Sequence, residues 1–415
     1  MSAQQLTPDG RGASGLLAEH HATWAEHLRR LGPLPPMSSR ELMNEIADSG
    51  LTGRGGGHFP TARKLALVAD TAHTIVIGNG GEGEPASSKD RVLLSDSPHL
   101  VLDGLALAAR ITGSRSMHLA ASDDLLDEVV SPALQDRPEG RVRLHAMPEG
   151  FVASQETAVA AVVAGRPAWP VTLAAPLMTR GVNERPTVVL NVETLAHIAL
   201  IARFGAAWFR SGGVADDPGT RLVTVSGAVR RPGVWEACGG TTLGEVVTVS
   251  GGMSEPVAAL LVGGYHGAWV PWTPRVAVSP RTRAGLQEYG ASPGAGVLIA
   301  LPERRCGLQA AADIAVYLAG ESAGQCGPCI NGLPAIADHL DALARGRFTD
   351  STVRELHRLT DVVDGRGACR HPDGTARFVR STLQVFAAEV REHAAGGCTA
   401  ARPNSFAHQS RRILR

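Results

Sequence analysis

Residues 49–64 read SGLTGRGGGHFPTARK, and the interpretation of the rest of the chain begins from this segment. Four glycines crowd around Arg54, namely Gly53, Gly55, Gly56 and Gly57. Because glycine adopts backbone angles that other residues avoid, such a loop can turn several N–H groups toward one ligand. Pro60 is expected to be the first residue of the next helix, whose N-terminus suits a phosphate. The alternative is a glycine-rich surface loop without a ligand.

A second loop with unusual chemistry follows a short apolar strand expected over residues 74–77. Residues 79–85 read NGGEGEP, and Lys89, Asp90 and Arg91 come soon after. Taken together, the two loops resemble the flavin- and NADH-binding subunit of respiratory NADH:quinone oxidoreductase (complex I), a family with relatives in soluble hydrogenases and formate dehydrogenases. The resemblance runs from about residue 49 to about residue 392, with separate motifs in the family's order.

The resemblance implies a flavin mononucleotide (FMN) on the first loop and NADH beside the second. The residues that it implies for FMN are Gly53, Arg54, Gly55, Gly56, Lys64, Asn79, Glu82 and Asn191. Those that it implies for NADH are Phe59, Glu84 and Glu156. No side chain is expected to act as a catalytic residue, because the cofactors carry the reaction and the protein supplies geometry and electrostatics.

Several positions depart from the family pattern around the nucleotide. Gly81 stands where the family has Asp, Gln155 replaces the first Glu of a Glu-Glu pair, Ser154 replaces Gly, and Phe151 replaces Tyr. Leu67 takes the place of an aromatic residue, and the region near Pro176 offers none. Aromatic stacking contributes about 0.5–1.5 kcal/mol beyond area burial. We therefore expect NADH to bind more weakly than in the family.

Composition agrees with a redox protein of two or three packed domains. The chain has 415 residues, of which 44% are hydrophobic, and its 40 basic and 40 acidic residues cancel. This balance argues against an electrostatic nucleic-acid binder. The N-terminus lacks the pattern of a secretory signal, and we expect no direct membrane insertion and a cytoplasmic location. Six cysteines in so long a chain indicate metal ligands and spare thiols rather than a disulfide framework.

The pattern of the chain predicts five segments. Residues 1–37 are expected to be a loosely packed lead-in, residues 38–213 the FMN/NADH-binding domain, 218–302 an SLBB domain, 306–397 a helical iron–sulfur domain and 398–415 a flexible basic tail. Ser38 followed by Glu41 predicts a capped helix over residues 39–48. Alternating strand and helix patterns up to about residue 213 predict an α/β, Rossmann-like domain with a largely parallel sheet. In that order, strands are expected near 74–78, 117–121, 141–146 and 187–190, and helices near 100–111, 124–130, 155–164 and 192–209.

A change of texture follows at residue 218. Residues 221–225 alternate with period two, residues 230–233 form a turn signal, a strand is expected at 234–236, and a helix is expected at 243–249. This run resembles the SLBB domain, a β-grasp-like module that follows the flavin domain in the family. A small β-rich spacer remains the alternative.

The C-terminal region predicts a helical bundle with a metal site. Apolar residues repeat at helical spacing in segments 310–319, 333–344, 352–363 and 375–392. By resemblance, the loops between them hold a 4Fe–4S cluster, with Cys326, Cys329 and Cys369 at three of the four ligand positions. Ala323 stands at the fourth and offers no donor.

Several outcomes are open for this cluster. Three thiolates with solvent or His371 on the remaining iron, a 3Fe–4S form, or loss of the cluster would each suit the sequence. Cys306 is not expected to replace the missing ligand, since a mostly helical segment places it roughly 20 Å from Ala323. Cys238 in the SLBB segment and Cys398 beyond the last helix are not obvious replacements either.

The resemblance implies an oxidoreductase that passes electrons from NADH through FMN to an iron–sulfur cluster. Its expected acceptor is a ferredoxin-like or thioredoxin-like iron–sulfur protein. Two other functions stay open: a flavin carrier linked to ferredoxin without NADH, and a degenerate, non-enzymatic docking paralogue. The joint presence of residues 53–64, Glu82 and Glu84 argues against the docking role.

Overall fold

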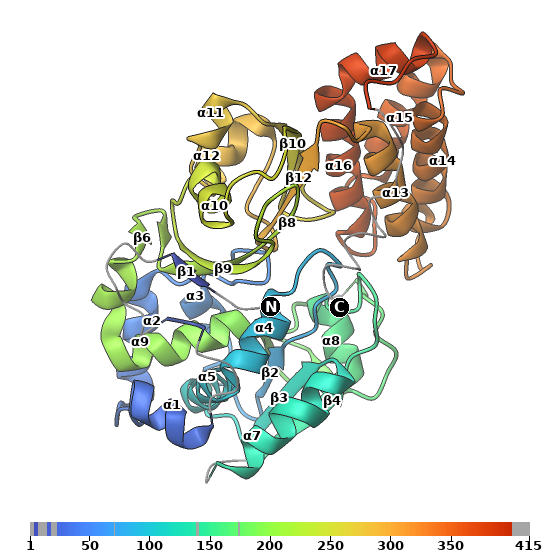
Figure 1. Ribbon diagram of the computed structural model, residues 1–415. Helices are drawn as coiled ribbons and strands as arrows, with labels where there is room; N and C mark the ends of the chain where they lie inside the picture. Colours follow the sequence, from blue (N-terminus) through green and yellow to red (C-terminus); the bar gives the residue numbers. More distant parts are fainter. Residues whose placement is uncertain are drawn as a thin grey trace. The chain divides into compact units, whose positions relative to one another are not determined.

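The chain is shown in Figure 1 as a computed structural model. The structure describes residues 4–6, 15–17, 23–69, 71–137, 141–172 and 175–400. It consists of two compact units. The first comprises residues 1–83, 88–223 and 234–240, and the second comprises residues 84–87, 224–233 and 241–415. The predicted basic tail lies, from residue 401 onward, outside the described residues.

A four-stranded parallel sheet forms the centre of the first unit. Its strands are β2 (Ile75–Asn79), β3 (Ser116–Ala121), β4 (Val142–Ala146) and β5 (Thr187–Asn191), in the order β4-β3-β2-β5. The strand order reverses beside β2, which pairs with β3 on one edge and β5 on the other. Ligands of open α/β sheets bind beyond the carboxyl ends of the strands at such a reversal. Here those ends are Asn79 and Asn191, which are register partners.

Helices cover both faces of this sheet, as the sequence predicted. Val76 and Val188 enter one hydrophobic cluster, whereas their neighbours Ile77 and Val189 enter another, because successive strand residues point to opposite faces. The first cluster includes residues of α2 (Ser39–Ser49), α5 (Pro98–Ile111) and α9 (Val192–Arg210), and the second includes residues of α8 (Glu156–Val163). The α/β class of this unit is therefore confirmed.

Helices α5 and α9 approach each other closely at Gly104. A Cβ atom built on Gly104 would lie 1.9 Å from the carbonyl oxygen of Leu195. Only glycine allows the two backbones to come this near. The α9 helix is kinked at Gly205, which has a φ of 84°.

One continuous helix among the described residues, α9, has the length and hydropathy of a membrane span, but 72% of its apolar window is buried inside the structure. The pair α4 (Lys89–Asp96) and α5 passes the same test only across a bend of 97°. Burial of this kind is typical of a core helix in a soluble protein, and the fold is of the soluble α/β type.

The N-terminal region is more tightly packed than predicted. Leu16 and Leu17 are buried, and α1 (Trp24–Leu31) buries Leu31 in the same cluster as the sheet helices. The expectation of a loosely packed lead-in is therefore wrong for the described part of residues 1–37. Its polar composition concealed three leucines that complete the core.

Local signals predicted some helix ends better than others. Ser38 and Glu41 form the predicted capping box at the start of α2. Pro60, expected as the first helical residue, is instead the residue before α3 (Thr61–Ala66), which is only six residues long. The helix expected over 124–130 is composed of three short pieces, α6 (Asp123–Leu125), the π-helix η1 (Leu126–Val130) and α7 (Ser131–Gln135).

The remaining parts of the first unit are small. A 3₁₀ turn, η2 (Val182–Glu184), precedes β5, and β6 (Gly213–Val214) pairs with β7 (Asp217–Pro218). Strand β1 (Gln4–Leu6) runs parallel to β9 (Gly233–Cys238).

The second unit contains a mixed sheet with helices, as predicted for the β-grasp-like module. Strand β12 (Val297–Pro302) is antiparallel to β10 (Val257–Val262) and parallel to the second half of β8 (Thr220–Gly227). Strand β11 (Ala268–Pro271) pairs with the other edge of β10. The helices of this module are α10 (Leu243–Val249), α11 (Pro274–Ala277), α12 (Arg283–Leu286) and the 3₁₀ helix η3 (Gln287–Tyr289).

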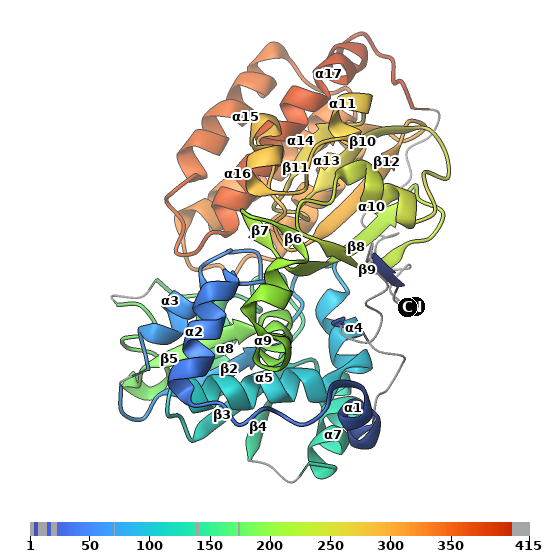
Figure 2. The same ribbon diagram turned by 90° about the vertical axis from the view of Figure 1, so that its left-hand side faces the viewer.

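A helical bundle completes the second unit, and Figures 1 and 2 show its long helices side by side. They are α13 (Gly307–Gly320), α14 (Leu333–Ala344), α15 (Asp350–Val363) and α16 (His371–Val385). The π-helix η4 (Pro328–Gly332) precedes α14. The last predicted helix, 375–392, is broken at Phe386, so that α17 (Ala387–Ala394) is a separate element.

Candidate functional site

The glycine-rich segment is a closed loop with an open crest. Thr52 and Pro60 form an isolated antiparallel bridge, and the Gly53 N–H donates to the Phe59 carbonyl at 2.8 Å. A Cβ atom built on Gly57 would meet nothing within 4 Å. At Gly55, a Cβ atom would lie 3.4 Å from Cβ of Asn191, which ends β5. The loop therefore lies beside the sheet end where the strand order reverses, with free space at its crest.

Arg54 turns into the protein rather than toward this space. Its guanidinium donates to the Pro218 carbonyl at 3.0 Å, lies 3.9 Å from the Asp217 carboxylate, and is 5.9 Å from the Phe209 ring centroid. Its backbone N–H donates to the Thr194 hydroxyl at 2.9 Å. In this structure the side chain of Arg54 anchors the loop, and it is the rest of the loop that faces open space.

Lys64 joins two of the predicted site residues. Its ammonium group donates to the Val189 carbonyl at 2.7 Å and forms an ion pair with Glu156. Lys64 is 8% exposed, whereas half of the Glu156 side chain is exposed. No local pattern in the sequence predicts this pair, since the two residues are 92 positions apart.

The amides at the two strand ends organise the second loop. Asn79 donates to the Ser154 carbonyl at 2.8 Å and accepts from the Gly81 N–H at 3.1 Å. Asn191 is the N-cap residue of α9, where its side chain accepts from the Glu193 N–H. These two predicted residues thus lie next to each other at the end of the sheet.

Glu82 lies at the start of helix α4. Its carboxylate accepts from the backbone N–H groups of Asp90 and Arg91, each at 3.2 Å. These are donors that a helix leaves unsatisfied in its first turn. The geometry gives Glu82 a capping role in addition to any contact with a ligand.

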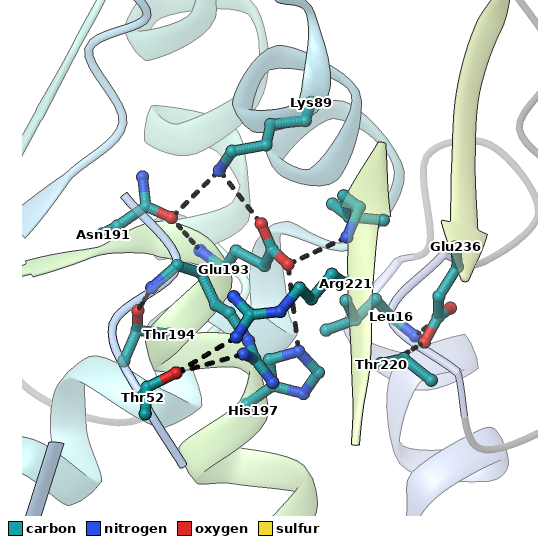
Figure 3. Close-up of polar contacts among 12 residues, drawn as sticks. Leu16, Thr52, Lys89, Asn191, Glu193, Thr194, His197, Thr220, Arg221 and Glu236 are labelled. Atoms are coloured by element: carbon teal, nitrogen blue, oxygen red, sulfur yellow. Dashed lines mark hydrogen bonds and ion pairs between the residues drawn. The ribbon is translucent and has the colours of Figure 1, made fainter. Parts of the chain in front are cut away.

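A buried ionic cluster lies directly behind Asn191 (Figure 3). Lys89 is 3% exposed and lies 2.6 Å from the Asp90 carboxylate, 3.0 Å from that of Glu193 and 3.2 Å from the Asn191 side-chain oxygen. Asn191 in turn donates to Asp90 at 2.8 Å, and Glu193 accepts from the Leu222 N–H at 2.9 Å.

Charge pairing governs ionisation in this cluster. Burial disfavours the charged form of Lys89, but the carboxylates of Asp90 and Glu193 outweigh burial and raise its pKa. Burial also raises the pKa of Asp90, against the pull of Lys89. Next to them, burial holds the pKa of His197 well below its usual range. Sequence analysis noted these charges without predicting their burial; the signal was a run of charged residues that directly precedes an apolar helix.

The residues expected near NADH differ in exposure. Phe59 is 41% exposed with the Arg63 guanidinium 5.8 Å from its ring centroid, and Leu67 is 53% exposed. Gln155 caps α8 by accepting from the Thr157 N–H at 2.7 Å. Glu84 belongs to the second unit, where its carboxylate accepts from the Tyr265 N–H at 2.8 Å. The structure therefore brings Phe59, Leu67 and Gln155 into one unit and assigns Glu84 to the other.

The three predicted cluster cysteines interact with one another in the bundle. Cys326 follows α13, Cys329 lies in η4, and Cys369 precedes α16. Partial burial opposes ionisation of Cys326, but the backbone N–H groups of Ala368 and Cys329 outweigh it and lower its pKa. Burial, followed by the charges of Cys326 and Cys369, raises the pKa of Cys329 to about 12. Three thiols thus meet between the helices.

His371 is not available as a fourth ligand in this arrangement. Its Nε2 lies 2.8 Å from the Leu318 carbonyl oxygen, and its Nδ1 lies 3.0 Å from Nε2 of His266. Both ring nitrogens are engaged, so that the His371 alternative from sequence analysis is not supported. Ser322, which interacts with the Cys329 thiol, is a nearby oxygen donor on the chain.

Comparison with known proteins identifies the family. Sequence models described as the Nuo51 FMN-binding domain, the SLBB domain and the NADH-ubiquinone oxidoreductase-F iron-sulfur binding region match residues 46–200, 222–264 and 309–393. The F subunit of NADH-quinone oxidoreductase from Streptomyces coelicolor is 30% identical over 384 residues, which cover 87% of this chain and 85% of that protein. The chain belongs to the F-subunit family of NADH-quinone oxidoreductase.

Another F-subunit relative and a solved structure agree with this assignment. The second F subunit of the same enzyme in Rhizobium meliloti is 28% identical over 380 residues, which cover 85% of this chain and 88% of that protein. A structure of an NAD+-reducing [NiFe]-hydrogenase in the H2-reduced state matches with a TM-score of 0.80 and 30% identity over 86% of this chain. The chain spans 63% of the length of that hydrogenase chain. The family and the three kinds of domain inferred from the motifs are confirmed.

Proposed function

We propose that this F-subunit relative is an NADH dehydrogenase-like oxidoreductase that passes electrons from NADH through FMN to an iron–sulfur cluster and a protein acceptor. One observation carries the proposal: a closed glycine loop with an open crest lies at the end of the sheet where the strand order reverses, beside Asn79 and Asn191. The match to an FMN-binding domain over the same residues supports it.

The residues of the first unit suit a flavin nucleotide. FMN, when bound, accepts a hydride and releases electrons one at a time. Backbone N–H groups between Gly53 and Gly57 would bind its phosphate, because no side chain fills the space at the crest. Lys64 would supply positive charge from a fixed position, and Asn79 and Asn191 would orient the ring system.

The dinucleotide would lie against more exposed groups. Phe59 would stack on an aromatic ring of NADH, and Glu156 and Glu84 would accept hydrogen bonds from its hydroxyl groups. An exposed Leu67 in an aromatic position and a neutral Gln155 in an acidic one favour a second candidate function. In that alternative, the flavin exchanges electrons with ferredoxin and NADH does not bind.

The cysteines suit an iron–sulfur cluster with an unusual ligand set. Cys326, Cys329 and Cys369 would supply three thiolates, and Ala323 leaves one iron without a cysteine ligand. We propose that solvent or the Ser322 hydroxyl completes the site. The acceptor would be a ferredoxin-like or thioredoxin-like iron–sulfur protein in the cytoplasm, in keeping with relatives that are named as subunits of larger enzymes.

A glycine substitution tests the flavin site without disturbing the fold. Gly57→Val places methyl groups in open space, so that the thermal unfolding midpoint should stay unchanged while the FMN affinity falls at least tenfold. Gly320→Ala, at the end of α13, also meets nothing within 4 Å and serves as the matched control with unchanged affinity. Equal FMN binding by both variants would contradict the assignment of the loop.

An anaerobic titration tests the donor. Protein reconstituted with FMN, iron and sulfide is titrated with NADH while the flavin and iron–sulfur absorbances are followed together. Bleaching of both supports the proposed path. If the flavin is bound and dithionite bleaches it but NADH does not, NADH is not the donor and the ferredoxin-linked alternative replaces it.

A further inference from the structure

A second group of metal-ligating side chains lies in the helical bundle and includes none of the three predicted cluster cysteines. It consists of Cys306, Glu389, His393 and Cys398, each of which offers one ligand atom within 4.8 Å of all the others. Three of the four residues are buried, and Cys398 is exposed. Sequence analysis treated Cys306 and Cys398 as spare thiols, because they lie far apart in the chain; the fold brings them together.

The spacing of these atoms suits a single tetrahedral ion. Sγ of Cys306 lies 3.5 Å from Nε2 of His393. Zinc binds thiolate sulfur at about 2.3 Å and imidazole nitrogen at about 2.0–2.1 Å, so that a tetrahedral angle separates the two ligand atoms by about 3.5 Å. Two ligands of one zinc ion can be at most about 4.6 Å apart, and the limit of 4.8 Å for the group is close to this bound.

Neighbouring groups hold the ligands in binding orientations. Nδ1 of His393 lies 3.1 Å from the Leu343 carbonyl oxygen, so that Nδ1–H donates to it and the lone pair of Nε2 faces the group. The Glu389 carboxylate accepts from the Gly307 N–H at 3.2 Å and from the Thr399 hydroxyl at 3.3 Å.

Cys306 lies at a favourable place for a thiolate. It is the N-cap residue of α13, a helix of 14 residues, and its Sγ accepts from the Gln309 N–H at 3.3 Å. The positive end of a helix stabilises a negative sulfur atom. Contacts outside the ion itself would therefore hold the three buried ligands.

We propose that Cys306, Glu389, His393 and Cys398 bind one structural Zn²⁺. Two sulfurs, one imidazole and one carboxylate are ligands that zinc prefers, and four protein ligands close the site to substrate. The ion links the start of α13, helix α17 and the residues that follow α17, and so fastens the end of the bundle. This site is separate from the proposed electron path and does not depend on it.

Metal analysis of the full chain tests the proposal. Protein freed of metal and incubated with ZnCl₂ alone, then desalted, should retain one zinc per chain by plasma mass spectrometry. Cys398→Ser is the decisive variant, because Cys398 is exposed and lies beyond the last helix, so that its loss should not prevent folding. We expect its zinc affinity, measured by competition with a chromophoric chelator, to fall at least about 100-fold, beyond the range for outer-shell changes.

Two controls separate this site from other cysteines. Cys238→Ser, in β9, should retain the wild-type zinc affinity. A variant with Cys326, Cys329 and Cys369 all changed to Ser should also retain one zinc, whereas it should lose the iron–sulfur absorbance. Co²⁺ in place of zinc should give the thiolate charge-transfer bands of a tetrahedral site, weakened in Cys398→Ser. Substoichiometric zinc in the wild type, or unchanged affinity in Cys398→Ser, would overturn the proposal.

Discussion

Replacement of Lys89 by Met tests the buried ionic cluster behind the candidate flavin site. The substitution keeps the length of the side chain but leaves the Asp90 and Glu193 carboxylates buried without their cation. Removing one partner of a buried ion pair costs about 3–5 kcal/mol. For a unit of about 150–250 residues, each kcal/mol lowers the unfolding midpoint by about 2–4 °C, which predicts a decrease of roughly 6–20 °C.

The assay is thermal unfolding followed by circular dichroism at pH 7.5, with and without FMN. Arg91→Met is the matched control on the same helix, because the Arg91–Asp124 pair is about half exposed on both sides. Exposed pairs contribute about 0.2–1 kcal/mol, so that the control should change little. Lys89→Met combined with Glu193→Gln should recover part of the loss. A decrease for Lys89→Met no larger than that for Arg91→Met would refute the reasoning.

Three further predictions concern NADH, iron and pH. Phe59→Ala should raise KM for NADH about 2- to 12-fold, from the stacking contribution of about 0.5–1.5 kcal/mol, and Leu67→Phe should lower it; equal values in steady-state assays would remove both residues from the NADH site. Ala323→Cys should raise the iron content of reconstituted protein to about four per chain, as for a cluster with four thiolates, and sharpen the reduced cluster's electron paramagnetic resonance signal; an unchanged iron content would count against residue 323 as a ligand position. Burial, and next to it the charge of His145, lowers the pKa of His118 from 6.5 to about 4. The unfolded chain therefore takes up this proton first, stability falls as the pH decreases from about 6.5 to about 4, and His118→Asn should reduce that slope in unfolding midpoints measured at stepped pH.

Local pattern accounts for what could be predicted from the sequence. The parallel strands were expected because β-branched runs alternate with helical periods, and the start of α2 was expected because Ser38 and Glu41 reciprocate as caps. The glycine loop and the amides at the strand ends were located because their residues adjoin in sequence to the elements that position them. Such signals extend over a few residues and need no knowledge of tertiary contacts.

What could not be predicted depends on contacts between distant residues. The inward turn of Arg54 requires Asp217 and Pro218, and the contact with Pro218 spans 164 positions. The ion pair of Lys64 and the meeting of Cys306 with Cys398 have the same origin. Periodicity and propensity describe one element at a time, and they cannot report which two elements a fold places together.

The burial of the N-terminal leucines shows a related limit. A segment rich in polar residues was expected to pack loosely, yet Leu16, Leu17 and Leu31 complete the core around α5 and α9. Average composition conceals a few apolar residues, and a core needs only those few. Removal of residues 1–37 is therefore not a neutral truncation for expression of this chain.

The contact at Gly104 makes the candidate site depend on a residue that faces no ligand. Helix α9 begins at the end of β5, so Asn191 and Glu193 move with it, and the missing side chain at position 104 sets how near it lies to α5. A methyl group there would act as a wedge and displace the start of α9 from the end of the sheet. A screen that scores only residues near the cofactor would miss this position, although a single carbon atom added to it would alter the alignment of the loop and the strand ends.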